Sequence, residues 1–283
     1  MTVSLTKSRI EIYLRTIGLI LLIAGSVWFI FPLVWMVSTS LKADTELFVY
    51  PPKWIPPSWQ WQNYPKALSE MRFVLLLKNT LVIVALNLAG TLLSCSLVAY
   101  SFARLRWPGR DICFIILLST MMLPPQVTMI PVFILFRSLG WIDTYLPLTV
   151  PAFFAAGVFF VFLLRQFFLT IPMDLEDAAQ IDGAAPFTIY WKIILPLAKP
   201  ALATVAIFTF VGTWNDFMGP LIYLSSETKK TLALGLQVFS STHNTEWNLL
   251  MAAALVILLP ILVIFFLCQR LFVQGITLTG IKG

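Results

Sequence analysis

Six long stretches of the chain are apolar and almost free of charge. Residues 16–41, 79–103, 112–136, 144–164 and 247–269 contain no Asp, Glu, Lys or Arg, and residues 200–226 contain only Asp216. A helix needs about 20 apolar residues to cross the hydrocarbon core of a bilayer. We therefore expect one 1–283 transmembrane domain whose six helices cover about residues 17–38, 79–103, 112–136, 145–164, 201–224 and 249–270.

The fold class that follows is an all-α membrane protein. Strands of a membrane barrel would be shorter and would alternate apolar and polar residues, which these runs do not. Hydrophobic residues make up 59% of the chain and charged residues 11%, whereas about a quarter of a soluble domain is charged. A soluble enzyme and a disordered chain are both excluded. One His and three scattered Cys form no metal-ligand pattern and no disulfide framework, so we expect no metal site.

The basic residues indicate the orientation. Six spans put both termini on one side of the membrane, and cytoplasmic segments carry more Lys and Arg than external ones. With cytoplasmic termini, eleven basic residues lie inside and eight outside. The short link with Arg104, Arg106 and Arg110 contributes most to this bias, so we expect both termini in the cytoplasm. The net charge of +6 then reports orientation rather than nucleic-acid binding.

The segment 165–200 between the fourth and fifth spans is much longer than a connection requires, and long loops are usually functional. We expect a helix here that begins with Asp174 as N-cap and Asp177 in the capping-box position. Gly183 is placed to end this helix in a left-handed conformation. Pro186 then starts a second short helix, and Pro196 closes it before the fifth span.

One face of this first helix has small residues in its middle, which allows another backbone to approach closely. Leu175, Ala178, Ala179 and Asp182 share that face by helical spacing. A helix resting on the lipid surface would carry basic residues. Four acids, including Glu176, instead favour docking into a basic groove of a protein, although a lipid-surface helix is the alternative.

The same residues resemble a known motif. Asp177-Ala178-Ala179, Gly183 and Ile194-Leu195-Pro196 are spaced as in the Glu-Ala-Ala loop of bacterial ABC importer permeases, which forms a coupling helix in a cleft of the ATPase subunit. Here Asp177 replaces the usual Glu, which keeps the charge and shortens the reach. Trp214-Asn215-Asp216 and the ending Gly280-Ile281-Lys282-Gly283 are similar to the second, smaller permease of maltose-type carbohydrate importers.

The resemblance implies the type I importer permease fold in a bacterial cytoplasmic membrane, alternating access, and a tail at 274–283 that reaches the ATPases. It implies a second permease subunit, two ATPase subunits, an extracytoplasmic solute-binding protein and surrounding lipid as partners. The chain has no phosphate-binding Gly-x4-Gly-Lys loop, so we expect no catalytic residue and no bound cofactor, with ATP and Mg²⁺ used by the ATPase partners. A permease for glycerol phosphate or another solute, and an ion-coupled carrier, are alternatives. The residues expected to couple to the ATPase are Asp174, Glu176, Asp177, Ala178, Ala179, Asp182, Gly183 and Pro196.

Asp216 is the one charged residue inside a span, and such residues face protein or water because they are costly in lipid. Trp214 and Asn215 beside it suggest a translocation path with an aromatic face for a sugar. The alternative is an Asp216 near the outer interface, paired with Lys229 or Lys230. Pro124 and the proline after it are expected to break the third span.

The first external loop, 42–78, is rich in proline and tryptophan. Tryptophan favours the membrane–water interface and proline fixes extended backbone. The loop is therefore either an interfacial cap or a docking surface for an extracytoplasmic partner.

Overall fold

The computed structural model describes the backbone of residues 2–240 and 245–280 and the side chains of residues 13–240 and 245–269. Every named element within these ranges is helical, and pairing between strands is limited to one isolated bridge from Ser240 to Thr245. The elements are α1 (Thr2–Ser40), η1 (Asp44–Glu46), α2 (Asn63–Glu70), α3 (Phe73–Arg104), α4 (Arg110–Ser119), η2 (Thr120–Met122), α5 (Pro125–Ser138), α6 (Leu146–Thr149), η3 (Val150–Phe154), α7 (Val158–Thr170), α8 (Asp174–Ile181), α9 (Pro186–Ile189), η4 (Tyr190–Ile194), α10 (Leu195–Leu197), α11 (Lys199–Trp214), α12 (Met218–Tyr223), η5 (Glu227–Lys229), α13 (Leu232–Gly235), η6 (Leu236–Phe239) and α14 (Trp247–Gly280).

Four of the described helical segments are long and apolar enough to cross a membrane, and there are six if each of two bent pairs forms one span. One bent pair joins α4 and η2 to α5 at 100°, and the other joins α9–α10 to α11 at 78°. The first bend lies at Pro124, where the backbone becomes extended before α5 begins at Pro125. The expected proline break in the third span is therefore confirmed.

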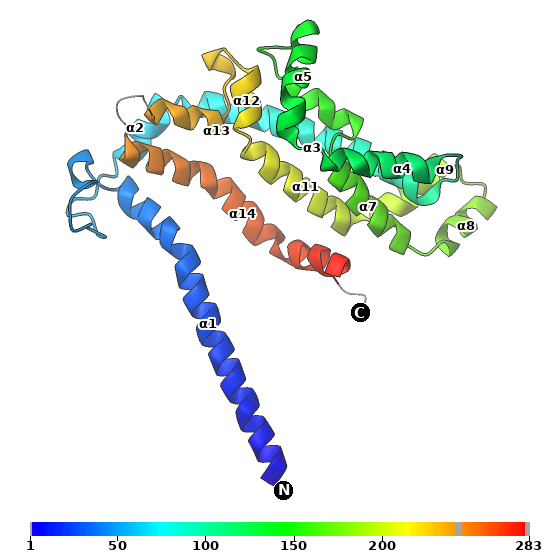
Figure 1. Ribbon diagram of the computed structural model, residues 1–283, viewed down its shortest axis with the longest axis horizontal. Coiled ribbons are helices and arrows are strands. Elements are labelled where there is room, and N and C mark those ends of the chain that lie inside the picture. The colour runs from blue at the N-terminus through cyan, green and yellow to red at the C-terminus, as the bar shows by residue number, and fades with distance from the viewer. Residues whose placement is uncertain (1, 241–244, 281–283) are drawn as a thin grey trace. The chain divides into compact units, whose positions relative to one another are not determined.

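The chain divides into two compact units. The first contains Met1–Met71 and Leu236–Val256, and the second contains Arg72–Gly235 and Ile257–Gly283. In the second unit, α3 packs along α7 and α11, and the three helices run beside one another in Figure 1. The apolar centre of this unit is completely buried, and its fully enclosed side chains include Cys95, Ala99, Val161, Leu164 and Val205.

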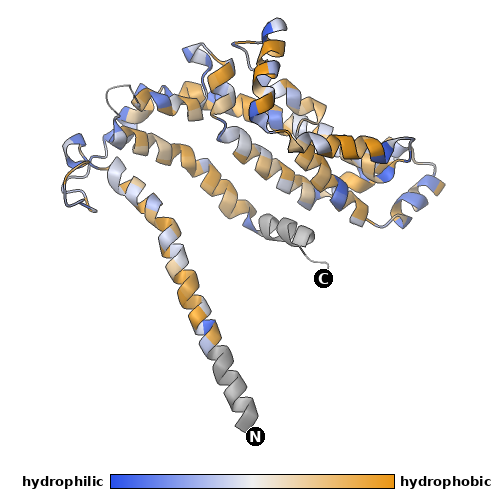
Figure 2. Cartoon of the chain, viewed as in Figure 1, coloured by the Kyte–Doolittle hydropathy of each residue, from blue (hydrophilic) through white to orange (hydrophobic). Residues whose placement is uncertain are grey.

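In the first unit, most of the apolar side chains of α1 between Tyr13 and Val37 are exposed, and Figure 2 shows the hydrophobic colour of much of this stretch. The proline- and tryptophan-rich loop folds back onto the end of α1. Trp54 packs edge-on against Phe31 and Trp35, and Lys42 lies 4.4 Å above the Trp35 ring. Burial lowers the pKa of Lys42, against the raising effect of a neighbouring glutamate. The loop is thus an ordered cap.

Two loops that follow the third and fifth spans are fastened by one carboxylate. Asp143 accepts hydrogen bonds from the backbone N–H groups of Ser225 and Ser226 and from the Ser226 hydroxyl, and Lys229 Nζ lies 3.0 Å from its Oδ2. These donors hold the pKa of Asp143 well below its usual range. Asp143 thereby fixes the turn at the end of α12.

The expected tail at 274–283 is partly helical. Helix α14 continues to Gly280, so residues 274–280 have helical backbone. The segment from 274 to 280 contains Gly275 and Gly280, and the helix continues through Gly275 as far as Gly280. Residues 281–283 lie outside the described part of the chain.

Candidate functional site

The long connection between α7 and α11 folds as a helix–turn–helix. The first helix, α8, begins at Asp174, and its N-cap is Met173, which makes no side-chain capping bond. The expectation that Asp174 is the N-cap is therefore wrong, because Met173 already has helical dihedral angles (φ −66°, ψ −31°) and Asp174 lies inside the first turn. Asp174, Glu176 and Asp177 still occupy that turn, where their charge suits the positive end of the helix dipole.

The C-terminal end of α8 forms as the sequence predicts. Gly183 has φ +81°, the left-handed region that glycine adopts without strain. The N–H of Ala184 donates to Ala179 O at 2.9 Å, and the N–H of Gly183 donates to Gln180 O at 2.9 Å. This is the Schellman pattern, which satisfies the last carbonyls of a helix.

The second arm is a chain of short helical pieces. It starts with Pro186 at the first position of α9, as expected, continues through the π-helical turn η4, and reaches α10, where Pro196 is exposed. Single π-turns within helices often occur at functional positions. The arm then bends into α11 at Lys199.

The solvent-facing side of α8 contains most of the residues singled out from the sequence. Asp174, Asp177, Ala178, Asp182 and Gly183 are exposed, with Leu175 and Ile181 beside them. Figure 2 shows the largely hydrophilic colour of this helix. Ala179 instead turns inward and packs against the apolar core, so the face expected from the spacing is rotated by about one residue.

Glu176 is the second inward-facing residue of α8, and it meets Arg104 at the end of α3. Their side chains are 4% and 1% exposed, and Arg104 Nε lies 3.1 Å from Glu176 Oε1. These two atoms form an ion pair without an aligned hydrogen bond. Arg104 also donates to Phe168 O, to Ile171 O and to Met173 Sδ. One guanidinium thus fixes the end of α7, the following turn and α8.

The environment of Glu176 favours its neutral form. Burial raises the pKa of Glu176, the carboxylate of Asp177 adds to this, and the guanidinium of Arg104 opposes both. The pair is therefore an anchor whose cost in desolvation is only partly offset by attraction.

Two further contacts tie the second arm to α3. The Tyr100 hydroxyl donates to Pro186 O at 3.1 Å, and the hydroxyls of Tyr190 and Ser96 lie 2.7 Å apart. The rings of the two tyrosines are 5.2 Å apart between centroids. Both arms of the connection therefore rest on the same helix.

The three residues expected to form a translocation path lie in three different environments. Trp214 is 2% exposed and its Nε1 donates to Ile257 O at 3.1 Å, so its ring belongs to the core. Asn215 is exposed and donates to Val211 O. Asp216 Oδ1 accepts the N–H of Gly219 at 3.0 Å and thereby holds the start of α12.

The alternative pairing of Asp216 with a lysine is wrong. Lys229 lies 3.0 Å from Asp143, and Lys230 lies 2.5 Å from Glu227. Asp216 and these lysines therefore serve separate turns.

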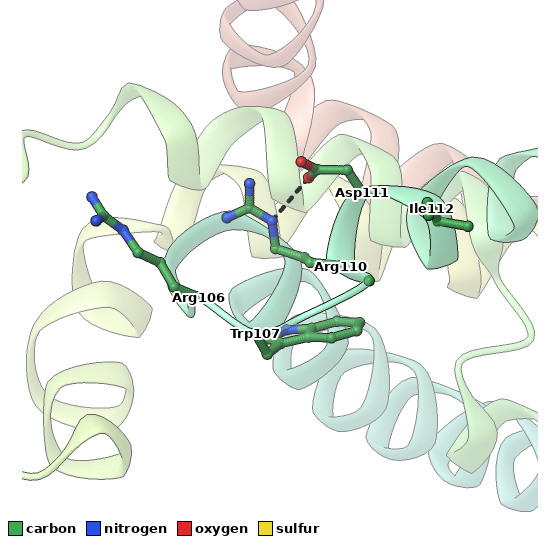
Figure 3. A pocket seen from close by; sticks show the side chains of 6 residues that line it. Arg106, Trp107, Arg110, Asp111 and Ile112 are labelled. Atoms are coloured by element: carbon green, nitrogen blue, oxygen red, sulfur yellow. Dashed lines mark hydrogen bonds and ion pairs between the residues drawn. The ribbon is translucent and has the colours of Figure 1, made fainter.

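A hollow of about 400 Å³ lies at the link between α3 and α4, and Figure 3 shows its lining. Arg110 Nε lies 2.9 Å from Asp111 Oδ1, the contact that is dashed in Figure 3, while the side chain of Arg106 extends away from it. Arg106 makes no ion pair with the residues that the structure describes. The lining therefore contains two basic residues and one acidic residue and carries a net positive charge.

Sequence reasoning missed Arg104 as a site residue. The sequence pattern marks Arg104 only as one of three arginines that indicate orientation. Arg106, two residues later, is exposed, whereas Arg104 is buried. Its position as the last residue of an apolar helix was the available signal, because a long side chain there can turn back toward the core. No group of His, Cys, Asp and Glu within the described residues could hold a metal ion.

The sequence pattern of the family described as "Binding-protein-dependent transport system inner membrane component" matches residues 93–278. This range includes α8, both arms of the connection and the part of α3 that contacts them. The match therefore covers the whole candidate site.

Individual proteins agree with this match. The chain is 35% identical to the sn-glycerol-3-phosphate transport system permease protein UgpE of Yersinia enterocolitica, covering 91% of this chain and 94% of the relative. It is 32% identical to the arabinooligosaccharides transport system permease protein AraQ of Bacillus subtilis, covering 91% and 92%. The fold is similar to that of a bacterial ABC transporter that imports the acidic polysaccharide alginate, with a TM-score of 0.81 and 23% identity over 93% of this chain and 97% of that one.

Proposed function

Because the chain belongs to the family of binding-protein-dependent transport system inner membrane components, we propose that it is a permease subunit of an ATP-driven carbohydrate importer. It is a multi-pass protein of the inner membrane. In the proposed orientation both termini and α8 lie in the cytoplasm, and the tryptophan-rich cap faces outward. Alternating access of the complex moves the solute across the membrane.

The observation that supports this proposal is that α8 exposes an acidic outer side while its inner side is bound to α3. Its outer side offers Asp174, Asp177 and Asp182 together with the exposed apolar side chains of Leu175 and Ile181, the latter 86% exposed. Acids around an apolar centre suit a groove with basic walls and an apolar floor. We assign this surface to the ATPase partner, with Ala178 and Gly183 permitting close approach of its backbone.

The contacts on the inner side of α8 would transmit a movement of this helix to the membrane-spanning helices. Arg104 joins α8 to the end of α3, and Tyr100 and Ser96 join the second arm to the same helix. A push on α8 therefore moves α3 directly, in addition to the helices α7 and α11 that flank the connection in sequence. The π-turn η4 and the bend before α11 are places where the second arm can change shape.

The remaining partners follow from the composition of such importers. We propose a second permease subunit that covers the exposed apolar side of α1, two ATPase subunits that use ATP and Mg²⁺, and a solute-binding protein on the outer surface. Two relatives name different solutes, arabinooligosaccharides and sn-glycerol 3-phosphate. A carbohydrate is our first choice, and glycerol phosphate is the second because the relative that names it is 35% identical over nearly the whole chain.

The test is uptake into proteoliposomes that contain the purified complex with all its subunits. We expect accumulation of solute that requires ATP inside and the binding protein outside. Uptake by this chain alone, driven by an ion gradient without ATP, would instead identify a secondary carrier. In parallel, a cysteine at Arg106, which is exposed and lies outside the surface assigned to the ATPase, should react with a membrane-impermeant maleimide in inside-out vesicles but not in intact cells.

A further inference from the structure

A second hollow, of about 300 Å³, lies between α3, η3, the start of α7 and α11. Its size is at the lower end of small-molecule sites. Asn87 and Thr91 reach it from α3, and Thr209 and Thr213 reach it from α11. These positions lie in the middle of the second and fifth expected spans, so the hollow is at membrane depth.

The backbone beside the hollow is irregular. The fourth span begins with the short helix α6 and the 3-10 segment η3, Ala155 has φ +53°, and regular α-helix resumes only at Val158. Pro151 and Gly157 from this broken stretch line the hollow. Non-helical backbone at membrane depth is tolerated where it is buried in protein or lines a water-filled cavity. The irregular backbone therefore indicates that the hollow does not face lipid.

The hydroxyl groups in the hollow are unusual for membrane helices. Buried threonines of the same two helices bond to the carbonyl four residues earlier, as Thr80 does to Leu76 O at 2.9 Å and Thr204 does to Pro200 O at 3.0 Å. Thr91 and Thr209 are each only 6% exposed, and the buried Thr209 hydroxyl has no hydrogen-bond partner among the described residues. Such groups are costly unless something else satisfies them.

The chemistry of the lining selects the class of occupant. None of the residues that line the hollow is charged. The Asn87 amide donates to Thr213 Oγ1 at 3.4 Å, which leaves its carbonyl oxygen as an acceptor, and two phenylalanines supply aromatic surface. A phosphate or carboxylate would find no cation here, whereas a neutral polyol could exchange hydrogen bonds with every polar group.

We propose that this hollow is a solute-contact site that takes a neutral sugar ring, held by the hydroxyls of Thr91 and Thr209 and the amide of Asn87. The inference rests on the proposed importer function and makes it narrower, because it excludes anionic solutes at this point. It places the sugar contact of this chain one to two turns before Trp214, which is buried.

The test replaces hydroxyls by methyl groups of the same shape in the whole complex. Thr91→Val with Thr209→Val should lower ATP-driven uptake of a neutral trisaccharide panel (maltotriose, arabinotriose and raffinose) by about tenfold at saturating concentration. The same double variant should unfold at the same or a higher temperature, because it removes the unsatisfied buried hydroxyl of Thr209. Thr204→Val is the matched control, since its hydroxyl already has a partner, and uptake should stay within about twofold.

Four results separate the possibilities. Wild-type uptake rate in the double variant would overturn the site, and so would reduced uptake that is matched by a lower unfolding temperature. Transport of sn-glycerol 3-phosphate with none of the neutral sugars moved would overturn the solute class while leaving the importer function intact. If the wild-type complex shows no ATP-driven uptake of any of these solutes, the proposed function itself fails.

Discussion

Replacing Arg104 by methionine tests the anchor that joins α8 to α3. Methionine keeps the length and apolar stem of the side chain but removes the guanidinium. Glu176 would then be buried without a partner, and Phe168 O and Ile171 O would lose their donor. The change leaves the exposed surface of α8 unaltered in sequence, so any effect reports the anchor alone.

The structure sets the size of the effect. Removing one partner of a buried ion pair costs about 3–5 kcal/mol, and each unpaired buried carbonyl costs about 1–3 kcal/mol. Glu176 limits the total by taking up a proton, which its raised pKa already favours. We expect the free energy that holds the connection against α3 to decrease by about 3–5 kcal/mol, while the stability of the rest of the domain changes little. Since 1.4 kcal/mol corresponds to a factor of ten in an equilibrium constant, the population of molecules in which α8 is detached from α3 should rise by at least about 100-fold.

Glu176→Gln should be much milder. It removes a carboxylate whose ionised form burial disfavours, and Arg104 keeps its two carbonyl partners. We expect a loss of about 1 kcal/mol. Because the pKa of Glu176 is raised in the folded state, its ionised form lowers stability as pH rises through the raised pKa, and this pH dependence should vanish in Glu176→Gln.

The assay combines two measurements on the reconstituted complex. Hydrogen exchange across residues 170–190 reports detachment of the connection, and solute uptake per ATP hydrolysed reports coupling. Arg106→Met is the matched control, because Arg106 is exposed and lies two residues away. Normal exchange and normal coupling in Arg104→Met would refute the anchor, as would equal effects of Arg104→Met and Arg106→Met.

Substitutions at three further places test the turn after α8, the Tyr190–Ser96 contact and the Asp143 cluster. Gly183→Val should cost about 1–3 kcal/mol at φ +81° and lower uptake per ATP hydrolysed, whereas Gly183→Asn, which tolerates this conformation, should be near normal; equal behaviour of the two would contradict the helix-ending role. Tyr190→Phe should lower stability by about 1 kcal/mol in thermal unfolding, and Ser96→Ala should add little to it; additive losses would show that the 2.7 Å contact is not shared. The lowered pKa of Asp143 stabilises the fold above the ordinary pKa near 3.9 and loses this as pH falls through the lowered value, so Asp143→Asn should remove that part of the acid dependence of the unfolding temperature; an unchanged acid profile would contradict it.

Much of the architecture could be predicted from the sequence because each feature rests on neighbours along the chain. The length of the apolar runs, the break at Pro124, the left-handed Gly183 and the start of α9 at Pro186 are all local signals. The predicted N-cap of α8, Asp174, lies one residue after the observed N-cap, Met173. The dihedral angles of Met173 depend on the turn before it, which the sequence pattern does not show.

The rest depends on contacts that spacing does not encode. Nothing in the pattern of α8 says that Glu176 turns inward, since that follows from Arg104, 72 positions earlier, being bound at the end of α7. Trp214 likewise resembles a site residue because it lies near Asp216 in the sequence, yet its indole N–H donates to Ile257 O and its ring is buried in the core. The irregular start of the fourth span had signals in Pro147 and Pro151 that an uncharged run concealed.

The central claim is that the acidic outer side of α8 is bound by a nucleotide hydrolase. The most direct measurement places a photo-crosslinking amino acid at Ile181, which is 86% exposed, in the complex within its native membrane. We expect crosslinking to an ATPase subunit, reduced by Asp177→Lys. Crosslinking only to lipid, or to a protein on the outer surface, would contradict it.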